Sequence, residues 1–323
     1  MRRTIVKFML ASLVAVAVAG GAWVLVAPSP AKAEFPGHNG RIAFMKQDSA
    51  EHWQIWVANK VLKNQVKLTS GSADSGWAVW KPGGAKLAFD SDGDIFKMNP
   101  DGTGVVNLTD SDSFDVDAGW SPDGKRIAFD SDRRNHQGRQ EIYTMAADGT
   151  DVHRVSTLPA GAEYDLAPRF SPDGKRLVFT RYNRDPELSA LFTIRIDGSG
   201  LRQLTPWGNG AGDADWAPDG NKIVFEANPE KGATDKGCHG EIYTVDPNGQ
   251  HLTNLTDNHC FAGSHEPVWS PNGEKILFLS AHAEDGEFGI ALATMNPNGK
   301  DRHFITRNPG ENQMHQPDWE SVP

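Results

Sequence analysis

The chain has 323 residues, with 33 Gly, 20 Pro and 10 Trp, and a formal net charge of −10. Long stretches lack the apolar periodicity of helices, so the composition indicates an all-β protein. A net negative surface disfavours nucleic acid and anionic lipid as partners.

The first 33 residues have the features of an export signal. Basic residues at positions 2, 3 and 7 precede an uncharged stretch over 8–27, and Ala31-Lys32-Ala33 has the small-x-small pattern of a cleavage site. The stretch is near the roughly 20 residues that span a bilayer, so a retained N-terminal anchor is the alternative. Removing residues 1–33 takes away four basic residues and no acidic ones, which leaves 28 basic against 42 acidic residues and a charge of −14.

These features predict an exported bacterial protein that is secreted, periplasmic or associated with the cell envelope. After cleavage of the signal we expect no membrane insertion. Residues 34–323 then form the mature chain, and they repeat one pattern so completely that a single domain is predicted.

Each repeat is an aromatic residue, a tight Pro-Asp-Gly-type turn, two short strands, a second Asx-Gly turn and a Leu-Thr ending. The clearest copies are 120–129 and 170–179, and weaker ones lie at 80–89, 216–225 and 269–278. Turn residues between short apolar runs indicate hairpins, so each repeat is expected to form four strands. The third strand is the most regular, with β-branched and aromatic residues at 54–57, 94–98, 141–145, 191–194, 241–245 and 290–294.

The aromatic markers lie 40 to 53 residues apart, a spacing that fits one four-stranded propeller blade per repeat. The markers are Trp80, Trp120, Phe170, Trp216, Trp269 and Trp319. The sixth unit is split, because 315–319 supplies its first half and 39–44 its second. The sequence therefore predicts a six-bladed β-propeller whose ring closes by pairing the N- and C-terminal strands. A closed ring exposes few strand edges, so a monomer is expected.

The repeats resemble the TolB-like propeller family, which is related to WD repeats and occurs in bacterial envelope and secreted proteins. The segment 130–133 leading to 141–150 is very similar to the family's repeat, and the resemblance covers about 280 residues. It implies the fold much more specifically than the function. TolB carries an α/β domain before its propeller, whereas few residues separate the expected cleavage site from the first strand here. The chain is thus similar to the propeller part alone.

The two cysteines, Cys238 and Cys260, fall in neighbouring loops of one propeller face. In an exported protein such a pair is expected to form a disulfide. The alternative is a metal site, since His239, His259 and His265 lie nearby, although the spacing matches no standard zinc pattern.

Propellers bind ligands in the funnel at the face where the first strand of each blade begins, so residues before the aromatic markers are the candidates for binding. The binding candidates are Asp117, Asp165, Arg169, Asp213, His265, Glu266 and His315, and Trp77, Asp115 and Asp215 also approach the opening. No cofactor is required by the sequence, but this acidic mouth could hold Ca²⁺ or another divalent metal, or a cationic side chain. The alternative is that these acidic residues have a structural role instead of binding a ligand, because Asp commonly accepts hydrogen bonds from turn amides.

Two functions of different class remain. The preferred one is an exported, non-catalytic propeller that binds a protein or cell-envelope component through its acidic funnel face. The alternative is a metal-assisted enzyme of the polysaccharide lyase or lactone hydrolase type, with His265, Glu266, His315 and Asp213 in the site. A serine peptidase is disfavoured because the chain has no Gly-x-Ser-x-Gly motif.

Overall fold

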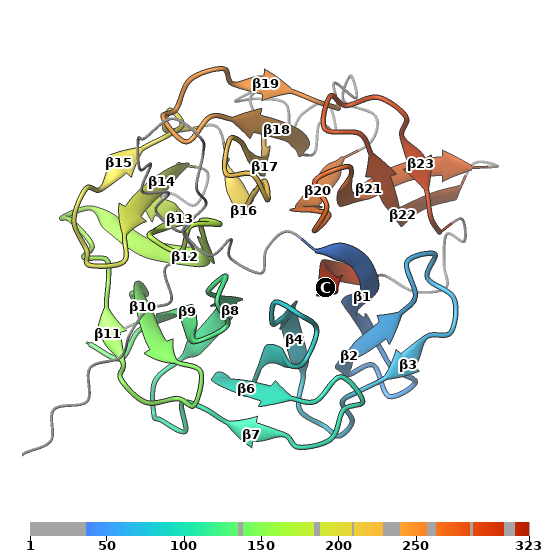
Figure 1. Cartoon of the computed structure of the whole chain (residues 1–323), viewed down its shortest axis with the longest axis horizontal. Helices are drawn as coiled ribbons and strands as arrows, with labels where there is room; N and C mark the ends of the chain where they lie inside the picture. Colours follow the sequence, from blue (N-terminus) through green and yellow to red (C-terminus); the bar gives the residue numbers. More distant parts are fainter. Residues whose placement is uncertain are drawn as a thin grey trace, which may run out of the picture. The chain divides into compact units, whose positions relative to one another are not determined.

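The structure, a computed structural model, describes residues 37–134, 138–183, 188–208, 210–228, 240–256, 263–284, 287–306 and 314–322. These residues form six four-stranded antiparallel sheets that surround a central axis (Figure 1). None of them is helical. The predicted six-bladed all-β propeller is therefore confirmed.

Each blade follows the chain from its inner strand to its outer strand, except blade 1. Blade 1 holds β24 (Met314–Val322), β1 (His38–Gln47), β2 (Trp53–Ala58) and β3 (Val66–Lys67). Blade 2 holds β4 (Ser75–Trp80), β5 (Leu87–Ser91), β6 (Asp94–Met98) and β7 (Val106–Asn107), and blade 3 holds β8 (Asp115–Trp120), β9 (Arg126–Ser131), β10 (Glu141–Ala146) and β11 (His153–Arg154).

The other three blades repeat this order. Blade 4 holds β12 (Ala162–Phe170), β13 (Arg176–Asn183), β14 (Ser189–Arg195) and β15 (Arg202–Gln203). Blade 5 holds β16 (Gly212–Trp216), β17 (Ile223–Ala227), β18 (Glu241–Val245) and β19 (Thr253–Asn254), and blade 6 holds β20 (Ser264–Trp269), β21 (Ile276–Glu284), β22 (Glu287–Met295) and β23 (His303–Phe304). Five aromatic markers are the last residues of their inner strands, as the repeat predicts.

The ring closes in blade 1, where the C-terminal strand β24 is the inner strand and pairs with β1. Glu320 of β24 accepts hydrogen bonds from the backbone N, Nε and Nη2 of Arg41 at 2.8, 3.0 and 2.9 Å. Because this bidentate pair joins the two ends of the described chain, it reinforces the predicted closure.

The core lies between adjacent blades. The second strand of every blade contributes one buried Phe, at 44, 89, 129, 179, 225 and 278. The apolar triplets of the repeat pack against the markers of the neighbouring blade. Among the strands that the structure describes, each blade contacts the blades on either side of it, as expected for a repeat fold.

No helix in the described parts of the chain is long and apolar enough to cross a membrane. The expected signal or anchor at 1–33 lies outside the described residues, as do Cys238 and Cys260. The cleavage site, the anchor and the disulfide therefore stay predictions.

Candidate functional site

A β-bulge interrupts every inner strand at the same position. The residue at each bulge has a left-handed backbone with φ between 45° and 58°, and we call these six the bulge residues: Trp77, Asp117, Ala167, Asp213, Glu266 and Gln316. Such a conformation costs about 1 to 3 kcal/mol for a residue other than glycine. It persists here because hydrogen bonds from the preceding blade hold most of the bulges.

These hydrogen bonds come from acidic side chains on the second strand of the preceding blade. Asp130 Oδ1 accepts from the backbone N of Ala167 at 3.1 Å, and Glu226 Oε2 accepts from the backbone N of Glu266 at 3.0 Å. Asp90 accepts in the same way from the backbone of Asp117. Some of the acidic side chains of the funnel therefore connect adjacent blades through hydrogen bonds.

Where the second strand has no acid, another bulge residue takes over this role. Leu279 and Met45 occupy the equivalent positions in blades 6 and 1, and the carboxylate of Glu266 accepts instead from the backbone N of Gln316. Gln316 Oε1 in turn accepts from the backbone N of Trp77 at 3.3 Å. At the junction of blades 4 and 5 the position is Thr180, whose buried hydroxyl has no hydrogen-bond partner among the described residues.

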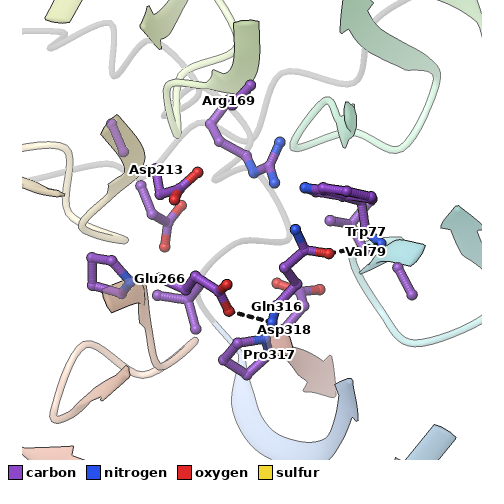
Figure 2. A pocket seen from close by; sticks show the side chains of 14 residues that line it. Trp77, Val79, Arg169, Asp213, Glu266, Gln316, Pro317 and Asp318 are labelled. Carbon is purple, nitrogen blue, oxygen red and sulfur yellow. Dashed lines mark hydrogen bonds between the residues drawn. The ribbon is translucent and has the colours of Figure 1, made fainter. Parts of the chain in front are cut away.

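A cavity opens on the axis beside the bulge residues (Figure 2). Its volume is about 50 Å³, and it is open to solvent at the mouth. The residues that line it are Trp77, Ala78, Val79, Ala167, Arg169, Asp213, Ala214, Asp215, Glu266, Pro267, Val268, Gln316, Pro317 and Asp318. We call it the funnel cavity.

A second cavity of about 90 Å³ lies further along the axis, beside the aromatic markers Trp80, Trp120 and Trp216. Both cavities touch the same five residues, which stand directly before markers: Val79, Arg169, Asp215, Val268 and Asp318. Arg169 is the only cation in this shared ring. The ring therefore separates the two cavities, and Arg169 lies at their boundary.

Asp215 and Asp318 at this boundary also link blades. Asp215 Oδ2 accepts from the backbone N of Trp269 at 2.8 Å, and Asp318 Oδ2 accepts from the backbone N of Trp80 at 2.6 Å. Burial raises the pKa of Asp215 to about 6 and that of Asp318 to about 7, while Arg169 opposes both shifts.

The carboxyls nearer the mouth repel one another. Burial, together with Glu226 and Glu266, raises the pKa of Asp213 well above its usual value, although its side chain is open to the solvent of the funnel. Burial also raises the pKa values of Asp117 and Asp130, whose carboxyls hydrogen-bond to each other. Such a bond requires a proton on one of the two carboxyls.

The structure places only part of the predicted site around the funnel cavity. Arg169, Asp213 and Glu266 line it. His315 does not line it, but its Nδ1 lies 3.4 Å from Glu266 Oε1. His265 pairs with Glu226 at 3.3 Å, a hydrogen bond that raises the pKa of His265.

Asp117 and Asp165 do not line the cavity. One oxygen of Asp117 is buried without a partner among the described residues. Asp165 is fully buried in blade 4, where Arg181 donates to both of its oxygens at 2.5 and 2.7 Å. Asp165 therefore forms a buried ion pair within blade 4 and does not face the funnel cavity.

The described residues contain no group of three or more His, Cys, Asp or Glu side chains arranged to hold a metal ion. The proposed ligands His265 and His315 each face a separate glutamate. Within the described part of the chain, the acidic mouth is thus a set of inter-blade hydrogen bonds around an open cavity.

Two polar residues of the cavity, Gln316 and Asp318, were not among the residues that the sequence pattern placed at the opening. Each occupies a repeat position that carries a candidate in another blade. Comparing the same position across all six repeats, instead of selecting charged residues, would have found them.

The family model for the TolB β-propeller domain matches residues 29–165 and 160–320. TolB from Acinetobacter baumannii superimposes with a TM-score of 0.67 at 22% identity, over 88% of this chain and 68% of that one. A putative TolB from Agrobacterium tumefaciens gives 0.62 at 18%, over 88% and 99% of the two chains. An oligogalacturonate lyase in complex with manganese gives 0.57 at 13%, over 84% and 74%.

Comparison with the sequences of curated proteins gives no match. The structural likenesses are all below 25% identity, so they concern the fold alone. The two family matches together span nearly all of the described chain. The chain belongs to the TolB β-propeller domain family.

Proposed function

We propose that the chain is an exported, non-catalytic propeller that binds a protein or cell-envelope component through its acidic funnel face. The observation that carries this proposal is the funnel cavity, which is open at the mouth and lined by inner strands of five blades. A cavity built from several rigid strands presents a preformed surface, and preformed concave surfaces are the usual binding sites of proteins.

The hydrogen bonds that the funnel carboxylates accept favour a binding function over a catalytic one. Glu226, Glu266, Asp215 and Asp318 accept backbone hydrogen bonds from the next blade. A carboxylate engaged in this way is held in place by the fold, and moving its proton would disturb a blade junction. Binding needs only the shape and polarity of the mouth.

The alternative is the metal-assisted enzyme, and the two His–Glu pairs, His265 with Glu226 and His315 with Glu266, are the observation in its favour. A pair of this kind can move a proton. The lyase with manganese shares only the fold with this chain, so it does not favour either function.

Site-specific photo-crosslinking tests the proposal. Benzoylphenylalanine replaces Trp77 at the mouth, or Val105 on the outer side of the same blade; both natural residues are exposed, at 38% and 51%. In bacterial cells that export the protein, we expect a discrete cross-linked species from position 77 and none from position 105. Equal products from both positions, or none from position 77, would refute a funnel-mediated partner.

Metal analysis of the purified protein separates the two functions. A stoichiometric transition metal that is lost in a His265→Ala, His315→Ala variant would overturn the non-catalytic proposal. Substoichiometric metal, unchanged by the two substitutions, would argue against the enzyme.

A further inference from the structure

The funnel cavity has hydrogen-bond donors that no described residue satisfies. Arg169 Nη1 donates to the backbone oxygens of Ala118 and Pro168 at 3.4 and 3.0 Å, and these bonds orient the guanidinium. Its Nε and Nη2 donate to no described residue. The free edge of the guanidinium therefore offers two parallel N–H groups to the cavity.

Gln316 adds a third donor beside them. Its Oε1 accepts from the backbone N of Trp77, an amide that needs an acceptor, so the orientation of the side chain follows from this bond. Nε2 donates to no described residue. Figure 2 shows the Gln316 amide and the Arg169 guanidinium facing the same space, on the side of Trp77. Two donor groups thus face one space with no acceptor between them.

The deeper carboxylates do not supply that acceptor. Asp215 Oδ1 and Oδ2 accept from the backbone N of Trp216 and Trp269 at 2.9 and 2.8 Å. Asp318 accepts from the backbone N of Trp80 and of Trp319. Both carboxylates are therefore turned toward the blades rather than toward the donors.

The opposite side of the cavity is an acceptor side. The carboxyl of Asp213 accepts no hydrogen bond from a described residue, and Figure 2 shows it with Glu266 across the cavity from Trp77. The ligand groups that enter this space must accept from Arg169 and Gln316 and donate to Asp213. Hydroxyl groups do both.

Trp77 supplies an apolar surface at the rim. The residue is 38% exposed although Trp is mostly buried in proteins, and its φ of 48° makes it a backbone outlier for a bulky residue. An exposed indole held by a rigid strand is an amphipathic contact surface with little entropy to lose on binding. The C–H face of a sugar ring can pack on it.

The mixed charges around the cavity disfavour small ions as ligands. A small cation would meet the guanidinium of Arg169, and an anion would meet the carboxyls of Asp213, Asp215, Glu266 and Asp318 in the same cavity. A neutral molecule with several hydroxyls satisfies both sides without net charge.

We propose that the mouth of the funnel cavity binds a neutral pyranose unit of a cell-envelope glycan. The ring packs on Trp77 at the rim, and the hydroxyls that enter the cavity accept from Arg169 and Gln316 and donate to Asp213. This deepens the proposed function and rests on it, because it names the chemistry of the component that the funnel face binds. The site holds the sugar without a reaction step.

Titration with small neutral sugars tests the proposal. The probes are the methyl glycosides of glucose, galactose, mannose and N-acetylglucosamine, followed by calorimetry and by the indole N–H signal of Trp77 in NMR spectra. We expect saturable binding of at least one probe, nearly independent of ionic strength because the ligand carries no charge. A single lost hydrogen bond to a charged group weakens binding by about tenfold or more.

The variants separate the site from general effects. Trp77→Ala and Asp213→Asn should weaken binding by about tenfold, and Trp77→Phe should retain most of it. Asp219→Asn, in a hairpin turn of blade 5, should leave binding unchanged. Circular dichroism and thermal unfolding confirm that each variant is folded.

Two outcomes would overturn the proposal. One is the absence of saturable binding by all four glycosides to the folded wild-type protein. The other is saturable binding of a lysine-containing tripeptide that is lost in Asp213→Asn and weakens steeply with salt, since that would make the cavity a cation site. In either case a cross-link to a protein from position 77 would leave the broader binding function intact.

Discussion

The ion pair between Asp165 and Arg181 is the feature of this fold that a single substitution should perturb most. The two side chains are 0% and 3% exposed, and they make two hydrogen bonds at 2.5 and 2.7 Å. Arg181 also lies 5.0 Å from the ring centre of Phe192. Asp165→Asn keeps the shape of the site but leaves a buried guanidinium without its counter-charge.

Because an arginine cannot lose its proton, the protein cannot escape this cost by titration. Removing one partner of a buried pair destabilises a protein by about 3 to 5 kcal/mol. We therefore expect Asp165→Asn to lower Tm by roughly 10 °C. Arg181→Met should cost less at acidic pH than at neutral pH, because burial already raises the pKa of Asp165 and the isolated carboxyl can take up a proton.

Urea unfolding followed by circular dichroism measures both variants at pH 5 and pH 7. Asp219→Asn, an exposed carboxyl-to-amide change in the hairpin turn after β16, is the matched control and should leave the midpoint nearly unchanged. A loss below about 1 kcal/mol for Asp165→Asn would refute the reasoning, because the pair would then behave like a hydrated surface pair.

Two further predictions concern the ring of blades. Asp318 has a pKa of about 7 in the folded protein against 3.8 unperturbed, so between these pH values the folded state binds more protons than the unfolded state. The free energy of unfolding therefore falls as pH rises through this window. Asp318→Asn should make the fall smaller, as measured by thermal unfolding from pH 4 to pH 8. Gly149 has φ of +90°, and an added Cβ would lie 2.4 Å from the backbone oxygen of Leu108 in the neighbouring blade, whereas at Gly71, with φ of +128°, a Cβ meets nothing. We expect Gly149→Ala to cost at least about 1 kcal/mol more than Gly71→Ala in urea unfolding, and equal costs would contradict the close approach of the blades.

Much of the fold could be predicted because the information is local and repeated. Each aromatic marker, Pro-Asp-Gly turn and apolar triplet specifies a hairpin from neighbouring residues, and six copies remove the ambiguity of any one. The split unit even predicted which strands close the ring, because only β24 could complete the sheet begun by β1.

The candidate site was predicted less completely because the repeat pattern does not specify the direction in which a side chain points. Asp165 and Asp213 both precede an aromatic marker, yet Asp165 is buried against Arg181 and Asp213 faces the cavity. Their offsets from the marker differ by two residues, and the bulge in every inner strand changes which side chains turn toward the axis.

Periodic residues, whose roles do not depend on distant partners, were enough to predict the fold class, the number of blades, the closure of the ring and the family. The packing of the blades was needed to show which acids serve the scaffold and which remain available to a ligand. Asp130 and Glu226 hold bulges in adjacent blades, while Arg169, Gln316 and Asp213 keep unused hydrogen-bonding groups. That division depends on contacts between blades far apart in the chain, and no local pattern records it.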